Sequence, residues 1–243
     1  DGTTVAIGAS ANDGANGSNS GHVRIYAWNS ATSAWEQQGA DIDGEAASDE
    51  SGTSVSLSSD GTTVAIGASA NDGANGSDSG HVRIYAWNST TSAWEQQGAD
   101  IDGEAANDQS GYSVSLSSDG TTVAIGAPYN DGANGPYSGH VRIYAWDSAN
   151  SAWEQQGADI DGEAADDWSG WSVSLSSDGT TVAIGALFND GNGTLSGHVR
   201  IYAWNSTTSA WEQQGADIDG EAANDYSGYS VSLSSDGTTV AIG

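Results

Sequence analysis

The chain of 243 residues has no cysteine, no methionine and no lysine, and it has only two prolines and one phenylalanine. Without cysteine there are no disulfides, thiolate metal sites or cysteine nucleophiles. No run of about 18 apolar residues occurs, so we expect no membrane insertion. Because the chain starts at Asp1 without a signal-peptide pattern, we expect a processed product or a window on a longer polypeptide.

Charge of one sign dominates the composition. The chain has 33 acidic residues against four arginines, which gives a formal net charge of −29. Such a chain repels phosphate backbones and anionic membrane surfaces, so we expect no nucleic-acid partner. The charged partners that this balance favours are cations: calcium, other metals or basic surfaces.

The sequence is a repeat from end to end. The phrase "SSDGTTVAIG" places an aspartate at positions 60, 119, 178 and 236, and Asp1 opens the same phrase. This predicts one array over 1–243, with units 1–59, 60–118, 119–177 and 178–235 and a partial fifth unit 236–243. Repetition at this period is typical of solenoids, propellers and other arrays, in which each unit buries its apolar surface on its neighbours.

Each unit predicts four strands. In the second unit these are 53–59, then a "DG" turn, 62–68, 81–87 and 94–101. We place Val55, Leu57, Val64, Ile66, Val82 and Ile84 on one face, and small residues with Tyr85 and Trp87 on the other. The tryptophan pairs 28/35, 87/94, 146/153 and 204/211 are expected to brace a hairpin. The prediction is therefore an all-β, β-propeller-like array of four-stranded antiparallel blades, about 59 residues each.

Each unit resembles an FG-GAP repeat, the blade of integrin-α-type β-propellers. The stretch "SGYSVSLSSDGTTVAIGAP" at 110–128 carries the motif, with a literal GAP at 126–128 and serine in place of the leading phenylalanine. Calcium-binding members of that family carry an extended acidic loop between the first two strands. Here "SSDGTT" is a tight turn with one carboxylate, so the resemblance implies no metal site there.

The two ends of the chain repeat each other, since 236–243 duplicates 1–8. Integrin-type propellers have seven blades, whereas four units are visible here, so the sequence leaves ring closure open. Either the chain is cut from a longer array, or the extra strand pairs with the next molecule. The second alternative predicts self-assembly with copies of the same chain.

The acidic phrase "DIDGEAASD" is the predicted metal site. Oxygen-rich turns of this kind suit calcium, which takes 6 to 8 hard ligands, although the EF-hand spacing is not met. The alternative is that the aspartates brace a loop between blades. The candidate ligands are Asp41, Asp43, Glu45 and Asp49; Asp100, Asp102, Glu104 and Asp108; Asp159, Asp161, Glu163 and Asp167; and Asp217, Asp219, Glu221 and Asp225. No other cofactor is predicted.

The glycine-rich loop that opens each unit, "ANDGANGSNSG" in the first, is a second candidate. It is one residue shorter in the fourth unit, which a metal coordination shell tolerates poorly, so we interpret it as a connection. Sequons for N-linked glycans recur on exposed turns at Asn16, Asn75, Asn88, Asn192 and Asn205.

Aromatic residues accumulate in loops of the later units, where they suit contact with a glycan or a partner, or packing between loops. These residues are Tyr129, Tyr137, Trp168, Trp171, Phe188, Tyr226 and Tyr229. An enzyme normally needs one asymmetric constellation, whereas His22, His81, His140 and His198 recur as equal copies, so we expect no catalytic site.

The sequence as a whole predicts a non-catalytic, extracellular or cell-surface structural repeat protein that builds or decorates a filament or matrix. The alternative is an adhesion or binding propeller for glycans or a protein partner, with loops shaped by calcium.

Overall fold

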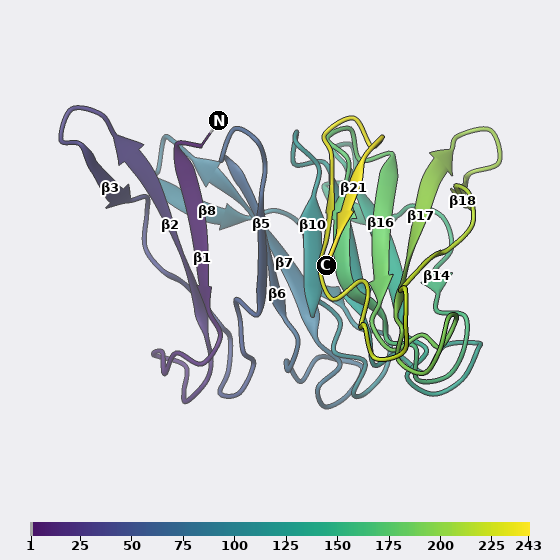
Figure 1. Ribbon diagram of the computed structural model, residues 1–243. Coiled ribbons are helices and arrows are strands. Elements are labelled where there is room, and N and C mark those ends of the chain that lie inside the picture. The colour runs from purple at the N-terminus through teal and green to yellow at the C-terminus, as the bar shows by residue number, and fades with distance from the viewer. Residues whose placement is uncertain (1) are drawn as a thin grey trace.

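The computed structural model describes residues 2–243 and consists of antiparallel sheets that follow one another along an arc (Figure 1). Blade 1 contains β1 (Thr4–Ala9), β2 (His22–Asn29), β3 (Ala34–Gln37) and β4 (Ile42–Asp43). Blade 2 contains β5 (Ser54–Leu57), β6 (Thr63–Ala68), β7 (His81–Asn88), β8 (Ala93–Gln96) and β9 (Ile101–Asp102). Blade 3 contains β10 (Ser113–Leu116), β11 (Thr122–Ala127), β12 (His140–Asp147), β13 (Ala152–Gln155) and β14 (Ile160–Asp161). Blade 4 contains β15 (Ser169–Leu175), β16 (Thr181–Ala186), β17 (His198–Asn205), β18 (Ala210–Gln213) and β19 (Ile218–Asp219), and β20 (Val231–Leu233) and β21 (Val240–Ile242) follow.

The strand order confirms the predicted all-β, propeller-like repeat. In blade 2 the strands lie in the order β5, β6, β7, β8, and blades 3 and 4 repeat it. Blade 1 starts at its second strand, and β20 and β21 form a separate two-stranded sheet. Residues 2–243 contain no helix long and apolar enough to cross a membrane.

The fourth predicted strand, 94–101, is wrong as one continuous element. It divides into β8, which pairs with Tyr85–Asn88, and β9, which pairs with the first two residues of β7. The chain bends between them at Gly98, whose φ of +83° is in the left-handed region. Both short strands therefore lie along the same edge of β7.

The predicted division of the two sheet faces is also wrong. Register pairs Val64 with Tyr85 and Ala65 with Ile84, so Val64 and Ile84 lie on opposite faces. A shift of one residue in pairing moves a whole strand's side chains to the other face, and the sequence alone did not fix this register. Each face of a blade consequently carries its own aliphatic residues.

Those two faces make the core, because consecutive blades stack with both faces buried. Between blades 2 and 3, Val82 and Ile84 pack against Val123 and Ile125, all four at most 1% exposed. The equivalent cluster between blades 3 and 4 includes Ile143 and Ile184. Blade 1 leaves its first face uncovered, so Ile7 is 48% exposed where its equivalent in blade 2, Ile66, is 1% exposed.

The turns that follow the inner strands are hydrogen-bonded to one another at the middle of the arc. Ser59 N–H donates to the carbonyl of Ser118, and Ser118 N–H donates to that of Ser177, at 2.8 and 2.9 Å. Figure 1 shows β3 and β18 at the two outer sides, the hairpin turns at the upper end and the long loops at the lower end. We call this lower end, formed by the β1–β2 and β4–β5 loops and their equivalents, the loop end.

Candidate functional site

Every interface between blades holds one arginine that reaches back to the preceding blade. Arg83 donates from Nη2 to the backbone carbonyl of Asp43 at 2.9 Å, and its Nη1 lies 3.4 Å from Glu45. The guanidinium also lies 5.7 Å from the centre of the Tyr85 ring. Arg142 and Arg200 repeat these contacts with Glu104 and Glu163. Three of the four basic side chains are thus used inside the array.

The repeated histidines lie beside these arginines and are almost fully buried. The Nδ1 atom of His81 is 3.8 Å from Asp100 Oδ2. Burial, followed by the charge of Arg83, lowers the pKa of His81 to about 4. Burial also lowers the pKa of His140 to about 4. Neutral, buried histidines such as His81 and His140 fit a packing role better than proton transfer.

The four carboxylates predicted to hold calcium in each unit turn towards different neighbours. In the first unit Asp41 and Asp43 lie near His22, whereas Glu45 lies beside His81 and Arg83 of the next blade. The buried carboxylate of Asp49 accepts the N–H groups of Glu45 and Ala46 at 3.0 and 2.8 Å.

The later units repeat this distribution. In the second unit Asp108 accepts the N–H of Ala105 and the Nδ2–H of Asn130, and Asp167 of the third unit makes the equivalent bonds. The groups of described residues whose possible metal-ligating atoms lie within 4.8 Å of each other are His22, Asp41 and Asp43; Glu45, His81 and Asp100; Glu104, His140 and Asp159; and Glu163, His198 and Asp217. In three of these groups the glutamate belongs to one unit and the histidine and aspartate belong to the next, so a metal site there would have ligands from two units. Calcium binding stays a prediction.

The glycine-rich opening loop braces itself with its own side chains. Asp13 Oδ1 accepts the N–H of Asn19, and Asn16 Nδ2–H donates to the carbonyl of Gly44 at 2.7 Å. The shorter loop of the fourth unit keeps both contacts, since Asp190 accepts from Leu195 and Asn192 donates to Gly220. The deletion therefore leaves both bonds in place, the one within the loop and the one to the loop that joins this blade to the next.

The five predicted glycan-bearing asparagines lie in two different settings. Asn16, Asn75 and Asn192 are exposed at the loop end. Asn88 and Asn205 are half-buried in the opposite hairpin turns, where their amide groups donate to Glu95 and Glu212. Glycan attachment stays a prediction at all five.

The loop aromatics gather into one continuous group, which we call the aromatic cluster. Trp168 contacts Tyr129 and Phe188 with ring centres 4.6 and 4.4 Å apart, and it stacks on Trp171 at 5.6 Å. The members are Tyr112, Tyr129, Tyr137, Trp168, Trp171, Phe188, Tyr226 and Tyr229, each in ring contact with at least one other.

The sequence-based set leaves out one member of this cluster. Tyr112 lies 4.6 Å from Trp171, and burial raises its pKa to about 12. Its position in the repeat, the same as that of Trp171 and Tyr229, is the signal that identifies it.

Two equivalent pockets open beside the aromatic cluster at the loop end. Pocket A, of about 290 Å³, is lined by Ala106, Asn107, Gln109, Tyr129, Asp131 and Tyr137. Pocket B, of about 560 Å³, has Ala165, Asp166, Trp168, Phe188, Asp190 and Leu195 at the same positions one unit further on, together with Glu163 and Asp167. Each pocket lies between the loop that joins two blades and the opening loop of the second of them.

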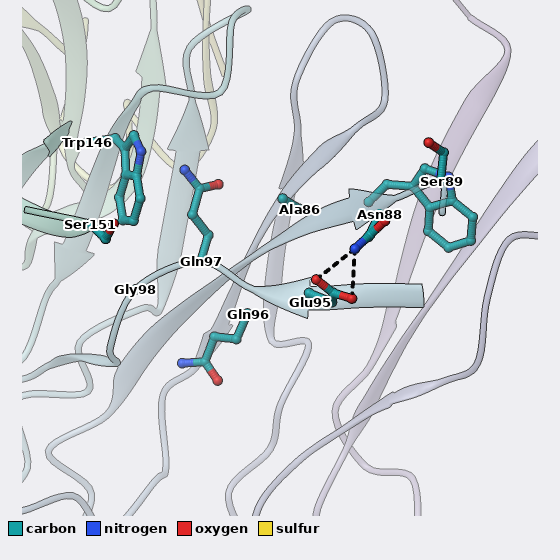
Figure 2. Close-up of a pocket in the computed structure, with 10 residues that line it drawn as sticks. Ala86, Asn88, Ser89, Glu95, Gln96, Gln97, Gly98, Trp146 and Ser151 are labelled. Atoms are coloured by element: carbon teal, nitrogen blue, oxygen red, sulfur yellow. Dashed lines mark hydrogen bonds between the residues drawn. The ribbon is translucent and has the colours of Figure 1, made fainter. Parts of the chain in front are cut away.

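A different kind of groove lies between the outer edges of neighbouring blades. The groove drawn in Figure 2 is lined by Trp146 and Ser151 of blade 3 and by Glu95 of blade 2, whose carboxylate accepts both hydrogen bonds drawn from Asn88. This groove of about 520 Å³ recurs between blades 1 and 2 with Trp87 and Glu36. Hydrogen bonds from Asn88 and Thr91 lower the pKa of the Glu95 carboxyl group.

The fold places the chain among known propellers. Over 91% of its length it superposes with a TM-score of 0.56 and 10% identity on a protein described as a putative 6-phosphogluconolactonase from Bacteroides fragilis NCTC 9343. The chain spans 51% of that protein. A putative 6-phosphogluconolactonase from Bacteroides uniformis ATCC 8492 aligns over 99% of this chain and 74% of its own, with 13% identity and a TM-score of 0.49. At 10% identity the likeness to the Bacteroides fragilis protein is one of fold alone.

The family model of the FG-GAP repeat matches residues 41–85, 100–144 and 158–202, which together make up more than half of the chain. Each match runs from the acidic phrase of one blade to the third strand of the next. No curated protein matches the sequence. The chain belongs to the FG-GAP repeat family.

Proposed function

We propose that the chain is a non-catalytic binding module at the cell surface or outside the cell, which uses its loop end to recognise a partner. The observation that carries this proposal is where the units differ. They differ by substitution at ten positions, which in the first unit are Ser10, Ala11, Ser18, Asn19, Ser48, Glu50 and Thr53 in the loops, and Asn29, Ala31 and Thr32 in one hairpin turn. Seven of the ten positions therefore belong to the loop end.

The constant frame of these loops supports the proposal. Ser48 and Glu50 have φ values of +71° and +56°, and Asp166 and Trp168 at the same places have +65° and +56°. The backbone thus keeps one conformation while the side chain changes from glutamate to tryptophan. Loops of constant backbone and changing side chain, held by a rigid scaffold, suit recognition.

A structural role is the second candidate, favoured by the sameness of the interfaces. Each of three consecutive interfaces repeats the arginine contact with the preceding blade. An array of such units extends without any new kind of contact. In that role the chain would build or decorate a filament or matrix by association with copies of itself.

A variant that gives the later units the loop residues of the first two units tests the binding role. It carries Tyr129→Ala, Trp168→Gln, Trp171→Thr, Phe188→Ala, Tyr226→Gln and Tyr229→Thr, with glutamine taken from Gln109 so that no charge is added. We expect it to keep the β-sheet circular dichroism and to lose binding to a panel of immobilised basic peptides, acidic peptides and neutral oligosaccharides. The control, Asp147→Asn with Asn150→Thr, changes the hairpin turn at the opposite end and should bind as the natural chain does.

Equal binding of the natural chain and the loop variant to every probe contradicts the binding role. Negative-stain images address the structural candidate at the same time. Regular fibres formed by the loop variant as well as by the natural chain would favour assembly, whereas dispersed particles favour the binding module.

A further inference from the structure

We propose that pocket B, with pocket A beside it, binds the cationic side chains of a lysine- or arginine-bearing segment of a partner protein. This inference rests on the proposed binding function and names the chemistry of its partner.

The surface of the chain offers almost no cation to neutralise its carboxylates. Arg83, Arg142 and Arg200 are 5%, 6% and 5% exposed, and each is held by a carbonyl and a glutamate of the preceding blade. The net charge of −29 therefore gives the surroundings of the molecule a negative electrostatic potential. Such a field speeds encounter with basic partners and disfavours acidic ones.

Four carboxylates line pocket B. Two of them have an arginine partner or two hydrogen bonds, and the other two have no cationic partner. Glu163 lies 3.7 Å from Arg200, and the buried Asp167 accepts two hydrogen bonds. By contrast, Asp190 uses only Oδ1, which accepts the N–H of Leu195 at 2.7 Å, and the Asp166 side chain accepts no hydrogen bond among residues 2–243. Neither aspartate has a cationic side chain within 4.0 Å in that part of the chain. Both are exposed to solvent.

Aromatic rings form the apolar wall of the same pocket. Trp168 and Phe188 both line pocket B with their ring centres 4.4 Å apart, and both are half-buried. A lysine ammonium or arginine guanidinium over a tryptophan face is attracted by the electrons of the ring, and its alkyl stem covers apolar surface. The combination of aromatic wall and unpaired carboxylates fits such a side chain better than a neutral ligand.

Pocket A repeats the arrangement with less charge. Asn107, Asp131 and Tyr129 of pocket A occupy the positions that Asp166, Asp190 and Phe188 occupy in pocket B. Tyr129 also contacts Trp168 at 4.6 Å, so the pockets share an aromatic wall. An extended basic segment could place one cation in each pocket, and pocket B should contribute more to its affinity.

Calorimetric titration of the full chain tests the proposal. The probes are a twelve-residue peptide of alternating lysine and serine, the same peptide with glutamate in place of lysine, and a neutral oligosaccharide. We expect the lysine peptide to bind, the affinity to fall as salt rises, and the glutamate peptide not to bind. Asp166→Asn and Asp190→Asn should each weaken binding about 3- to 10-fold, and Trp168→Gln about 3- to 30-fold.

These variants are chosen so that the fold survives. Asn107 and Gln109 already occupy the positions of Asp166 and Trp168 in the preceding unit. The amide of Asp190→Asn keeps an oxygen that accepts the Leu195 N–H. The matched control is Asp147→Asn, which removes one charge in the opposite hairpin turn and recreates the residue of the other three units. It should change the affinity less than twofold.

Three outcomes overturn the inference. An equal loss with Asp147→Asn and Asp166→Asn would mean general charge attraction. Binding of the oligosaccharide that depends on Trp168 and not on Asp166 would mean glycan recognition, and the proposed binding function would stand. Binding of no probe by the natural chain would contradict the inference, whereas the proposed function would then fall only if the wider panel also failed.

Discussion

The indole Nε1–H of Trp94 donates a 2.8 Å hydrogen bond to the backbone carbonyl of Gln38, which lies in the preceding blade. Trp153 and Trp211 donate in the same way to Gln97 and Gln156. The cross-strand tryptophan pairs therefore do more than brace their own hairpin, because one ring of each pair also ties its blade to the one before.

This bond makes a prediction at Trp153. Trp153→Phe keeps an aromatic ring and removes the 2.9 Å bond to Gln97, so we expect the free energy of unfolding to fall by about 1 kcal/mol. Urea denaturation measures the change. Trp35→Phe is the control, since Trp35 is 46% exposed in blade 1. Equal losses at the two positions would show that the bond between blades contributes nothing.

Gly98 gives a second prediction from close packing. A Cβ atom there would lie 3.0 Å from Trp146 and from Trp153, and φ is +83°. Gly215 has a φ of +80° but nothing within 4 Å of its added Cβ. We expect Gly215→Ala to cost roughly 1 kcal/mol from backbone strain, and Gly98→Ala about 1–3 kcal/mol more. Thermal melts that give the two variants the same stability would contradict the packing of these tryptophans.

A third prediction concerns pH. Because burial lowers the pKa of His81 and His140 to about 4, the unfolded chain binds more protons than the folded one below pH 6.5. Their contribution is fully present above pH 6.5 and is lost as the pH falls towards 4. The charged groups around His81 are Arg83, Asp100, Asp49 and Glu45, and they stay in place in His81→Asn. We expect the double variant His81→Asn and His140→Asn to lose less stability between pH 6.5 and 4 than the natural chain, and an unchanged slope would contradict this.

Chelation tests the calcium hypothesis for the acidic phrase. An ion present at 100 times its dissociation constant adds about 2.7 kcal/mol, which corresponds to roughly 5–10 °C in melting temperature for a chain of this size. Calcium should therefore raise the melting temperature and EDTA should reverse the rise. Asp100→Asn, which removes a member of the group that Asp100 forms with Glu45 and His81, should reduce the effect. An unchanged melting temperature on adding EDTA would discard the hypothesis.

The sequence predicted the architecture well because its period and its turns are regular. The "DG" turn at Asp60 forms as expected, and its carboxylate accepts hydrogen bonds from Ser58 and Thr62. The faces could not be predicted, since β6 and β7 are joined by a long loop that does not specify whether Val64 or Ala65 shares a face with Ile84. The register that decides this depends on packing between blades.

The candidate site was predictable in part. Trp168 and Tyr129 stand out in the sequence because the first unit has Glu50 and Ala11 at their positions. The contact between their rings, whose centres are 4.6 Å apart, could not be predicted. The two residues lie in different loops and are 39 positions apart in the chain. The uncompensated charge of Asp166 and Asp190 also depends on tertiary contacts that the spacing of residues does not reveal.

Hydrogen exchange of the intact chain with and without the lysine peptide is the most direct test of the loop end as a recognition surface. We expect new protection in residues 105–109 and 129–137 around pocket A and in 163–168 and 188–195 around pocket B, with the hairpin turns 88–93 and 147–152 unchanged. Protection confined to those hairpin turns and the outer grooves, with the loop end exchanging as before, would contradict it.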